Sequence, residues 1–178
     1  MTLPQTDPRL IQLANRIRDV PDFPKPGILF KDVTPLLASA EGLRMCLDLL
    51  GERAQPFGAD LIVGVESRGF IFGAALAAHL GIGFAPVRKP GKLPWKRLRE
   101  DYTLEYGTDA LELHEDAVAD KKVLVVDDLL ATGGTASATG RLVARGGGEL
   151  RGYLFVVELA FLSGRRALSG KVDSLICY

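Results

Sequence analysis

Val123-Leu124-Val125-Val126-Asp127-Asp128-Leu129-Leu130-Ala131-Thr132-Gly133-Gly134-Thr135 is the stretch of this sequence that decides its fold. Its first four residues are a run of valine and leucine, typical of a strand buried on both faces. Two carboxylates then end the predicted strand, and a loop of small residues leads into a predicted helix over residues 134–145. A buried strand followed at once by a helix is the repeating unit of a parallel α/β sheet.

The loop of this stretch has the composition of an anion-binding site. Its members are small or carry a hydroxyl group: Ala131, Thr132, Gly133, Gly134 and Thr135. Glycines let backbone N–H groups converge on one point, and the start of a helix adds partial positive charge, so the loop can hold a phosphate. It is not a Walker loop, because no Gly-Lys-Ser/Thr sequence follows.

The two carboxylates beside this loop, Asp127 and Asp128, would repel a bare phosphate. A ribose 5-phosphate removes the conflict, because its phosphate can occupy the loop while its vicinal hydroxyls donate hydrogen bonds to the acids. The plainer alternative is that the pair only caps a helix and lines a solvated turn. The acids and the loop together favour a sugar-phosphate site.

Strand and helix patterns alternate along the rest of the chain. Short apolar runs predict further strands, over residues 61–65, 83–88, 153–157 and 172–177. Apolar residues at helical spacing predict further helices, beginning at Asp7, Ser39 and Gly69, the first of them ending before Pro21. Alternating residues predict a hairpin or partly exposed ribbon, over residues 102–106 and 110–114. We therefore predict an α/β fold with a mostly parallel central sheet flanked by helices, which binds ligands at the carboxyl ends of its strands.

Composition narrows the class of protein further. The chain has 178 residues, 22 basic against 22 acidic side chains and 47% apolar residues, which fits one domain over residues 1–178. A net charge of zero gives no general field for nucleic acid or a membrane surface, so neither is predicted as a partner. Two cysteines cannot form a disulfide framework, and the polar N-terminus has no apolar signal core, so we predict a cytoplasmic protein.

Two more segments have residues that suit a polyanion. Glu66-Ser67-Arg68-Gly69-Phe70 follows the predicted strand over residues 61–65 and presents an arginine and backbone donors at a helix start. The segment over residues 88–99 is basic and is interrupted by proline and glycine. Such a charge run is either a solvated loop or a mobile basic lid whose closure would strengthen electrostatic interactions by expelling water.

Five segments together resemble one known family. Residues 123–135 resemble the phosphoribosyl pyrophosphate signature of type I phosphoribosyltransferases. Pro21–Gly27, Glu66–Phe70, Arg88–Pro94, Leu104–Gly107 and Asp127–Thr135 resemble, in the same order, segments of the adenine-specific members. The resemblance covers nearly the whole chain.

The resemblance implies a type I phosphoribosyltransferase-like fold and a purine-salvage reaction. In that reaction, ribose 5-phosphate passes from phosphoribosyl pyrophosphate to N9 of adenine, giving AMP and pyrophosphate, with Mg²⁺ held mainly by the substrate phosphates. It also implies a homodimer, a small N-terminal hood over the base site formed by residues 1–35, and a flexible lid over residues 89–108.

The resemblance further implies a role for each matching residue. Glu105 would handle the purine proton near N7 as a general acid or base. Phe23 would stack on the purine, and the Leu29 backbone would read its edge. Residues 131–135 would bind the 5-phosphate, and Asp127 and Asp128 would hold the ribose hydroxyls. Pyrophosphate contacts are implied for Ser67, Arg68, Lys89 and Lys92, and further substrate contacts for Lys31, Arg88 and Tyr106.

Two other functions remain open at this point. The chain could be a regulator that senses phosphoribosyl pyrophosphate and has lost catalysis; known regulators of that type place a DNA-binding domain ahead of the fold, and only about twenty residues precede Pro21 here. It could also be an unrelated α/β protein that binds sugar phosphates or nucleotides. A test of transferase activity separates these functions.

Overall fold

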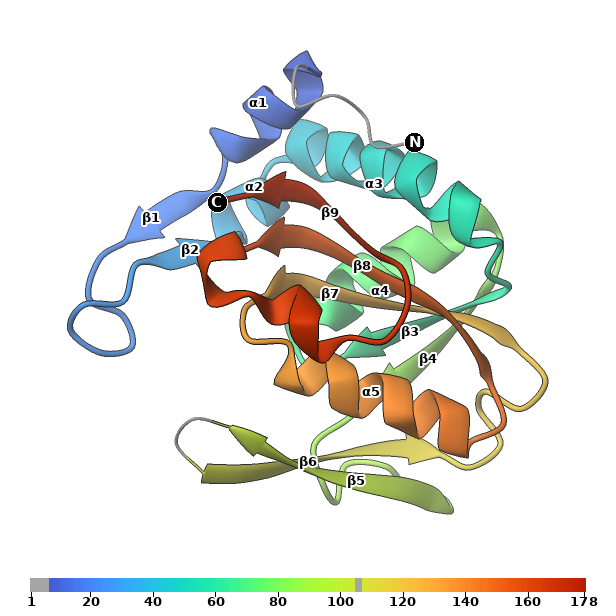
Figure 1. Cartoon of the computed structure of the whole chain (residues 1–178). Helices are drawn as coiled ribbons and strands as arrows, with labels where there is room; N and C mark the ends of the chain where they lie inside the picture. Colours follow the sequence, from blue (N-terminus) through green and yellow to red (C-terminus); the bar gives the residue numbers. More distant parts are fainter. Residues whose placement is uncertain (1–6, 105–106) are drawn as a thin grey trace. The chain divides into compact units, whose positions relative to one another are not determined.

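A computed structural model describes residues 7–104 and 107–178, with backbone only for residues 103 and 104. The chain divides into two compact units, residues 1–49 and residues 50–178. Figure 1 labels the elements of both.

The first unit contains short elements, in the order α1 (Pro8–Ala14), β1 (Arg18–Val20), β2 (Phe30–Asp32), α2 (Thr34–Ala38) and most of α3 (Ala40–Ala54). The two predicted caps are confirmed. The Asp7 carboxylate accepts a hydrogen bond from the Arg9 N–H at 2.9 Å, and the Ser39 hydroxyl accepts one from the Gly42 N–H at 3.0 Å.

The prediction that the first helix continues toward Pro21 is wrong. The helix ends at Ala14, and β1 and β2 then pair antiparallel around the proline-rich segment. Strands of three residues are too short to show an alternating pattern in a sequence. The β1–β2 hydrogen bonds begin at Arg18, so the chain leaves the helix although Ile17 has helical spacing. The helix α2 was likewise not predicted.

The second unit is built on a five-stranded parallel sheet. Its strands lie in the order β4 (Gly83–Val87), β3 (Leu61–Val65), β7 (Lys122–Leu130), β8 (Glu149–Glu158) and β9 (Val172–Cys177). All four pairings are parallel, as predicted. The interior strand β3 is buried along its whole length, which explains why it consists of apolar residues and glycine.

Two crossover helices cover this sheet. The helix α4 (Arg68–Leu80) joins β3 to β4, and α5 (Gly134–Arg145) joins β7 to β8. These two connections run in opposite directions along the sheet, and because such crossovers are right-handed, the helices lie on opposite faces (Figure 1). The strand order therefore reverses between β3 and β7, and the carboxyl ends of these two strands form the topological switch point.

A two-stranded antiparallel ribbon, β5 (Arg97–Leu104) with β6 (Gly107–His114), belongs to the same unit. The predicted ribbon is thus confirmed, but it begins earlier than expected. The interpretation of residues 88–99 as a loop throughout is wrong for the last three of them, because Arg97 to Arg99 pair with β6. The flexibility predicted for residues 89–108 stays a prediction.

The decisive stretch differs from its prediction in one respect. The strand β7 does not end at the acid pair but continues to Leu130, because Asp127 pairs with Phe155 and Leu129 with Val157 of β8. The helix α5 has the predicted bounds. Three short 3₁₀ helices complete the described chain: Gln55–Phe57, Ala160–Leu162 and Gly164–Ala167. Within the described residues, no helix combines the length and apolar character that a membrane span requires.

Candidate active site

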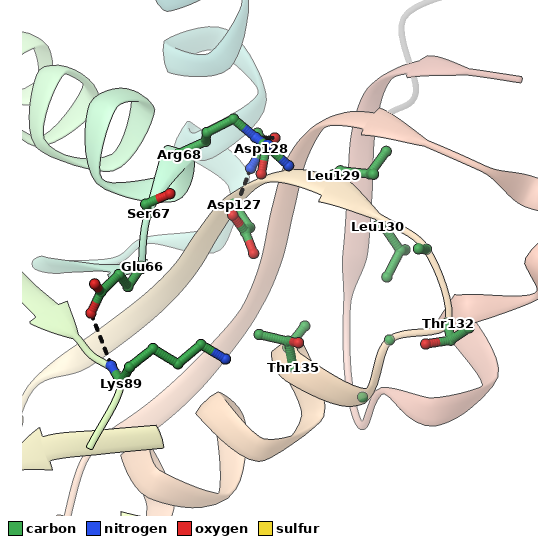
Figure 2. Close-up of a pocket in the computed structure, with 14 residues that line it drawn as sticks. Glu66, Ser67, Arg68, Lys89, Asp127, Asp128, Leu129, Leu130, Thr132 and Thr135 are labelled. Atoms are coloured by element: carbon green, nitrogen blue, oxygen red, sulfur yellow. Dashed lines mark hydrogen bonds and ion pairs between the residues drawn. The ribbon is translucent and has the colours of Figure 1, made fainter. Parts of the chain in front are cut away.

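A pocket of about 280 Å³ lies at the topological switch point (Figure 2). One wall comes from the end of β3 and the start of α4, and includes Ser67 and Arg68. The opposite wall comes from the end of β7, the following loop and the start of α5. Lys89, which follows β4, completes the pocket. The sheet topology thus brings together three segments that are far apart in the sequence.

The loop between β7 and α5 presents the first turn of the helix to this pocket. Gly133 occupies the N-cap position with a φ of 83°, a left-handed conformation that favours glycine. A Cβ atom at Gly133 would also collide with the Gly164 carbonyl oxygen. No side chain in the described part of the chain caps this helix end, so its N–H groups can bind an anion.

The acid pair lies next to this loop and is tightly packed. Asp128 is 6% exposed and forms an ion pair with Arg68. An Asp127 carboxylate oxygen accepts the Asp128 N–H at 2.9 Å. A Cβ atom at Gly69 would lie 2.6 Å from that Asp127 oxygen, so only glycine lets α4 begin this close to β7.

Burial and the negative charge of Asp128 raise the pKa of Asp127 well above its usual range, and the Arg68 charge only partly offsets them. Ionised Asp127 is therefore electrostatically unfavourable in the protein alone. A hydroxyl donor or a positive charge placed in the pocket would stabilise it.

Glu66 holds the position of Lys89. Its carboxylate accepts the Lys89 N–H at 2.9 Å (Figure 2). It also accepts the Arg88 Nε–H at 3.3 Å. These hydrogen bonds, that from the Lys89 backbone foremost, lower the pKa of Glu66 despite its partial burial. Figure 2 shows the Lys89 side chain extending in the direction of Thr135.

The structure brings most of the predicted phosphate- and sugar-binding residues into this pocket. Ten predicted residues line it: Ser67, Arg68, Lys89, Asp127, Asp128, Ala131, Thr132, Gly133, Gly134 and Thr135. Arg88 and Lys92 do not belong to the lining. The Arg88 guanidinium instead donates to Glu66 and, at 3.2 Å, to the Lys92 carbonyl oxygen.

The predicted base-binding residues lie in the first unit. Phe23 and Leu29 are 52% and 47% exposed, and the Phe23 ring packs edge-on against Phe30 with 5.2 Å between centroids. The Lys31 ammonium forms an ion pair with Asp19 at 2.6 Å across the β1–β2 ladder.

Two predicted residues, the proposed acid–base residue Glu105 and Tyr106, lie outside the described residues.

The sequence interpretation missed several residues of the pocket. Glu66, Leu129, Leu130 and Ala136 also line it. Glu66 could have been found, because it directly follows a buried strand and begins a quoted motif. The other three have side chains that carry no chemical signal.

The pocket offers few ligands for a metal of its own. The described residues contain no group of three or more histidine, cysteine, aspartate or glutamate side chains that could hold an ion. Asp127 and Asp128 can each supply a carboxylate oxygen of the kind that Mg²⁺ prefers. This donor set fits an ion that arrives with a phosphorylated substrate.

The fold and the pocket define a doubly wound α/β protein with an anion-binding loop and an acid pair at its switch point. The chain belongs to the phosphoribosyl transferase family, whose domain model matches residues 36–176. It is 58% identical over 165 residues to the adenine phosphoribosyltransferase of Anaeromyxobacter dehalogenans, covering 92% of this chain and 96% of that protein.

Solved structures give the same result. The adenine phosphoribosyltransferase of Thermoanaerobacter pseudethanolicus is 48% identical with a TM-score of 0.92, and the match covers 95% of this chain and 99% of that one. The enzyme of Saccharomyces cerevisiae, solved with adenine and an imino-altritol bisphosphate, is 41% identical with a TM-score of 0.91, over 94% and 98% of the two chains. The predicted family and fold class are thus confirmed.

Proposed function

We propose that this chain is a purine-salvage enzyme that transfers the phosphoribosyl group of phosphoribosyl pyrophosphate to N9 of adenine, forming AMP and pyrophosphate. The observation that carries the proposal is the joining, in one pocket, of an uncapped helix start, an acid pair and two cationic side chains. Each feature suits one group of the substrate: the helix start suits the 5-phosphate, the acid pair suits the ribose diol, and the cations suit the pyrophosphate. The relatives at 55–58% identity that bear the name adenine phosphoribosyltransferase support the choice of base.

The acid pair has a role in the chemical step. Departure of pyrophosphate leaves positive character on the ribose ring, and a preorganised negative group beside that ring stabilises the transition state more than the ground state. Asp127 suits this role because burial and Asp128 raise its pKa. Its ionised form is unfavourable in the protein alone, so a nearby positive charge stabilises it strongly. The ribose hydroxyls would donate hydrogen bonds to the same carboxylates.

The cations would stabilise the leaving group. Arg68 and Lys89 come from the start of α4 and from the segment after β4, and not from the phosphate loop itself, so a donor with its 5-phosphate in the loop could direct its pyrophosphate toward them. Mg²⁺ bound to the substrate phosphates would neutralise further charge on the departing pyrophosphate. Closure of residues 89–108 over the site would exclude water, which otherwise hydrolyses the activated sugar.

The remaining parts of the proposal rest on the family resemblance. Glu105 would exchange the purine proton, with Phe23 stacking on the base and residues 1–35 forming the hood above it. We also propose a homodimer and a cytoplasmic location, the latter because both cysteines, Cys46 and Cys177, are free thiols.

A base panel tests the proposal directly. Pyrophosphate release from phosphoribosyl pyrophosphate is measured with adenine, hypoxanthine, guanine or orotate in the presence of Mg²⁺. We expect release with adenine and at most traces with the other bases. Release with a different base instead would overturn the base assignment, whereas binding of the donor without release would indicate a sensing protein.

A further inference from the structure

Lys89, one of the two cationic side chains that line the pocket, is paired with a carboxylate that has no part in the proposed reaction. The Lys89 ammonium forms an ion pair with Asp109 of β6 and donates to the Tyr102 hydroxyl at 3.3 Å. The Tyr102 hydroxyl in turn donates to the same Asp109 oxygen at 3.2 Å. The three groups form a closed cluster at the edge of the pocket.

The ribbon fixes the geometry of this cluster. Tyr102 and Asp109 are direct partners in the β5–β6 ladder. Tyr102 is only 6% exposed, and its hydroxyl accepts a hydrogen bond from the Thr135 hydroxyl of the phosphate loop at 3.3 Å. The second Asp109 oxygen accepts the Ala110 N–H at 2.8 Å. Asp109 is therefore held in place beside Lys89 and does not meet it by chance on a free side chain.

The electrostatics match the geometry. Partial burial disfavours the Asp109 charge, but hydrogen bonds from Lys89, Ala110 and Tyr102 outweigh burial and lower its pKa. Asp109 is therefore ionised at neutral pH. An ionised carboxylate on the Lys89 ammonium occupies the place that a phosphate oxygen would take, and it repels any polyanion that approaches the same cation.

We propose that Asp109 is an internal competitor of pyrophosphate for Lys89, and that it keeps the affinity of the site for pyrophosphate low. This inference rests on the proposed function, because it takes Lys89 as a pyrophosphate contact. When pyrophosphate binds, Lys89 exchanges the Asp109 carboxylate for a phosphate oxygen. When pyrophosphate leaves, Asp109 takes the ammonium back, which lowers the cost of releasing the product.

The test is binding of inorganic pyrophosphate with Mg²⁺ to the full chain, measured by isothermal titration calorimetry. Asp109→Asn keeps the size of the side chain and removes its charge. We expect it to bind pyrophosphate about fivefold more tightly than the original protein, the size set by a partly exposed ion pair. Asp101→Asn is the matched control: it removes a charge from the same ribbon, but Asp101 pairs with Arg99 and is 66% exposed, so affinity should not change.

A second substitution distinguishes competition from a general charge effect. In a Lys89→Met background, Asp109→Asn should no longer tighten binding, because the shared cation is gone. Asp109→Ser serves as a second charge-removing variant if the asparagine variant folds poorly. Unchanged or weaker pyrophosphate binding in the Asp109 variants, or equal tightening with and without Lys89, overturns the inference. If the original protein binds no pyrophosphate at all, the proposed function fails and this inference fails with it.

Discussion

β7 and β8 lie side by side in the sheet, and near their carboxyl ends β7 carries two acidic side chains and β8 carries one. Glu158 of β8 is 4% exposed, and both of its oxygens are satisfied, by Arg165 at 2.6 Å and by the Ser174 hydroxyl at 2.6 Å. The hydrogen bonds from Arg165, followed by that from Ser174, lower the pKa of Glu158 despite its burial. At Asp127 of β7, burial and a neighbouring acid raise the pKa.

The two strands show how an acidic residue that stabilises the fold differs from one that serves a binding site. At Glu158 the chain supplies the positive partner, so the charge contributes to the stability of the fold. At the pair of Asp127 and Asp128, Arg68 is the one positive partner that the described residues supply for two carboxylates, so the fold carries an electrostatic cost that a ligand can relieve. Four predictions test this contrast.

The largest effect is expected for Asp127→Asn. Without its charge, the ribose of the transition state loses a stabilising partner, and kcat/KM should fall by about 10²- to 10³-fold. The free energy of unfolding at pH 7.5 should rise instead, by about 1 kcal/mol, because a buried charge beside Asp128 is gone. Steady-state kinetics and urea unfolding of one preparation measure both quantities. Kinetics unchanged by the substitution would remove Asp127 from the site.

A smaller loss of activity is expected for Gly69→Ala. The new Cβ would lie 2.6 Å from the Asp127 oxygen and 3.1 Å from the Val126 carbonyl oxygen, so the start of α4 must move away from β7. A displacement of this kind at a catalytic group should reduce kcat/KM by about 10- to 100-fold. Activity within twofold of the original protein would show that the close approach is not needed.

Glu158→Gln should affect stability and leave catalysis nearly unchanged. The substitution breaks a charge pair whose arginine is 49% exposed, so we expect the free energy of unfolding to fall by about 2 kcal/mol, less than for a fully buried pair. The matched control is Glu149→Gln, whose pair with Arg151 is exposed on both sides and should contribute under about 0.5 kcal/mol. Equal effects of the two substitutions would contradict the structural role of Glu158.

The smallest effects are expected from pH, which should alter the changes in the free energy of unfolding caused by Asp127→Asn and Glu158→Gln. The folded pKa of Glu158 lies below its unfolded value of about 4.3, so its contribution is present above that value and is lost as pH falls through the folded pKa. The folded pKa of Asp127 lies above its unfolded value of about 3.9, so its destabilisation develops as pH rises through the folded pKa.

Urea unfolding between pH 4 and pH 8 distinguishes the two signs. The stability gained by Asp127→Asn should shrink steadily toward pH 4, whereas the loss caused by Glu158→Gln should hold down to about pH 5. A gain from Asp127→Asn that does not depend on pH would mean that the carboxylate is not electrostatically strained.

Local patterns predicted much of the fold. The bounds of α5 and of β9 follow from helical spacing and from an apolar run, and both agree with the structure. The continuation of β7 to Leu130 could not be seen locally, because it depends on pairing with β8, which lies about thirty residues away in the sequence. The strand β5 was hidden in a basic segment for the same reason: its first residues are strand only through their ladder with β6.

The candidate site was predictable where neighbouring residues carry the chemistry. The acid pair and the loop that follows it are contiguous, so their composition alone indicated an anion and a diol. The cluster of Lys89, Tyr102 and Asp109 was not predictable, since the three residues come from three segments that meet only in the folded ribbon. The pairing of Arg68 with Asp128 was hidden in the same way, across 60 residues of sequence.

The most direct test of the central claim is a crystal structure of this protein with AMP. We expect the 5-phosphate on the backbone N–H groups of residues 131–135 and both ribose hydroxyls on Asp127 and Asp128. A phosphate bound elsewhere, or a ribose turned away from the two acids, would contradict it.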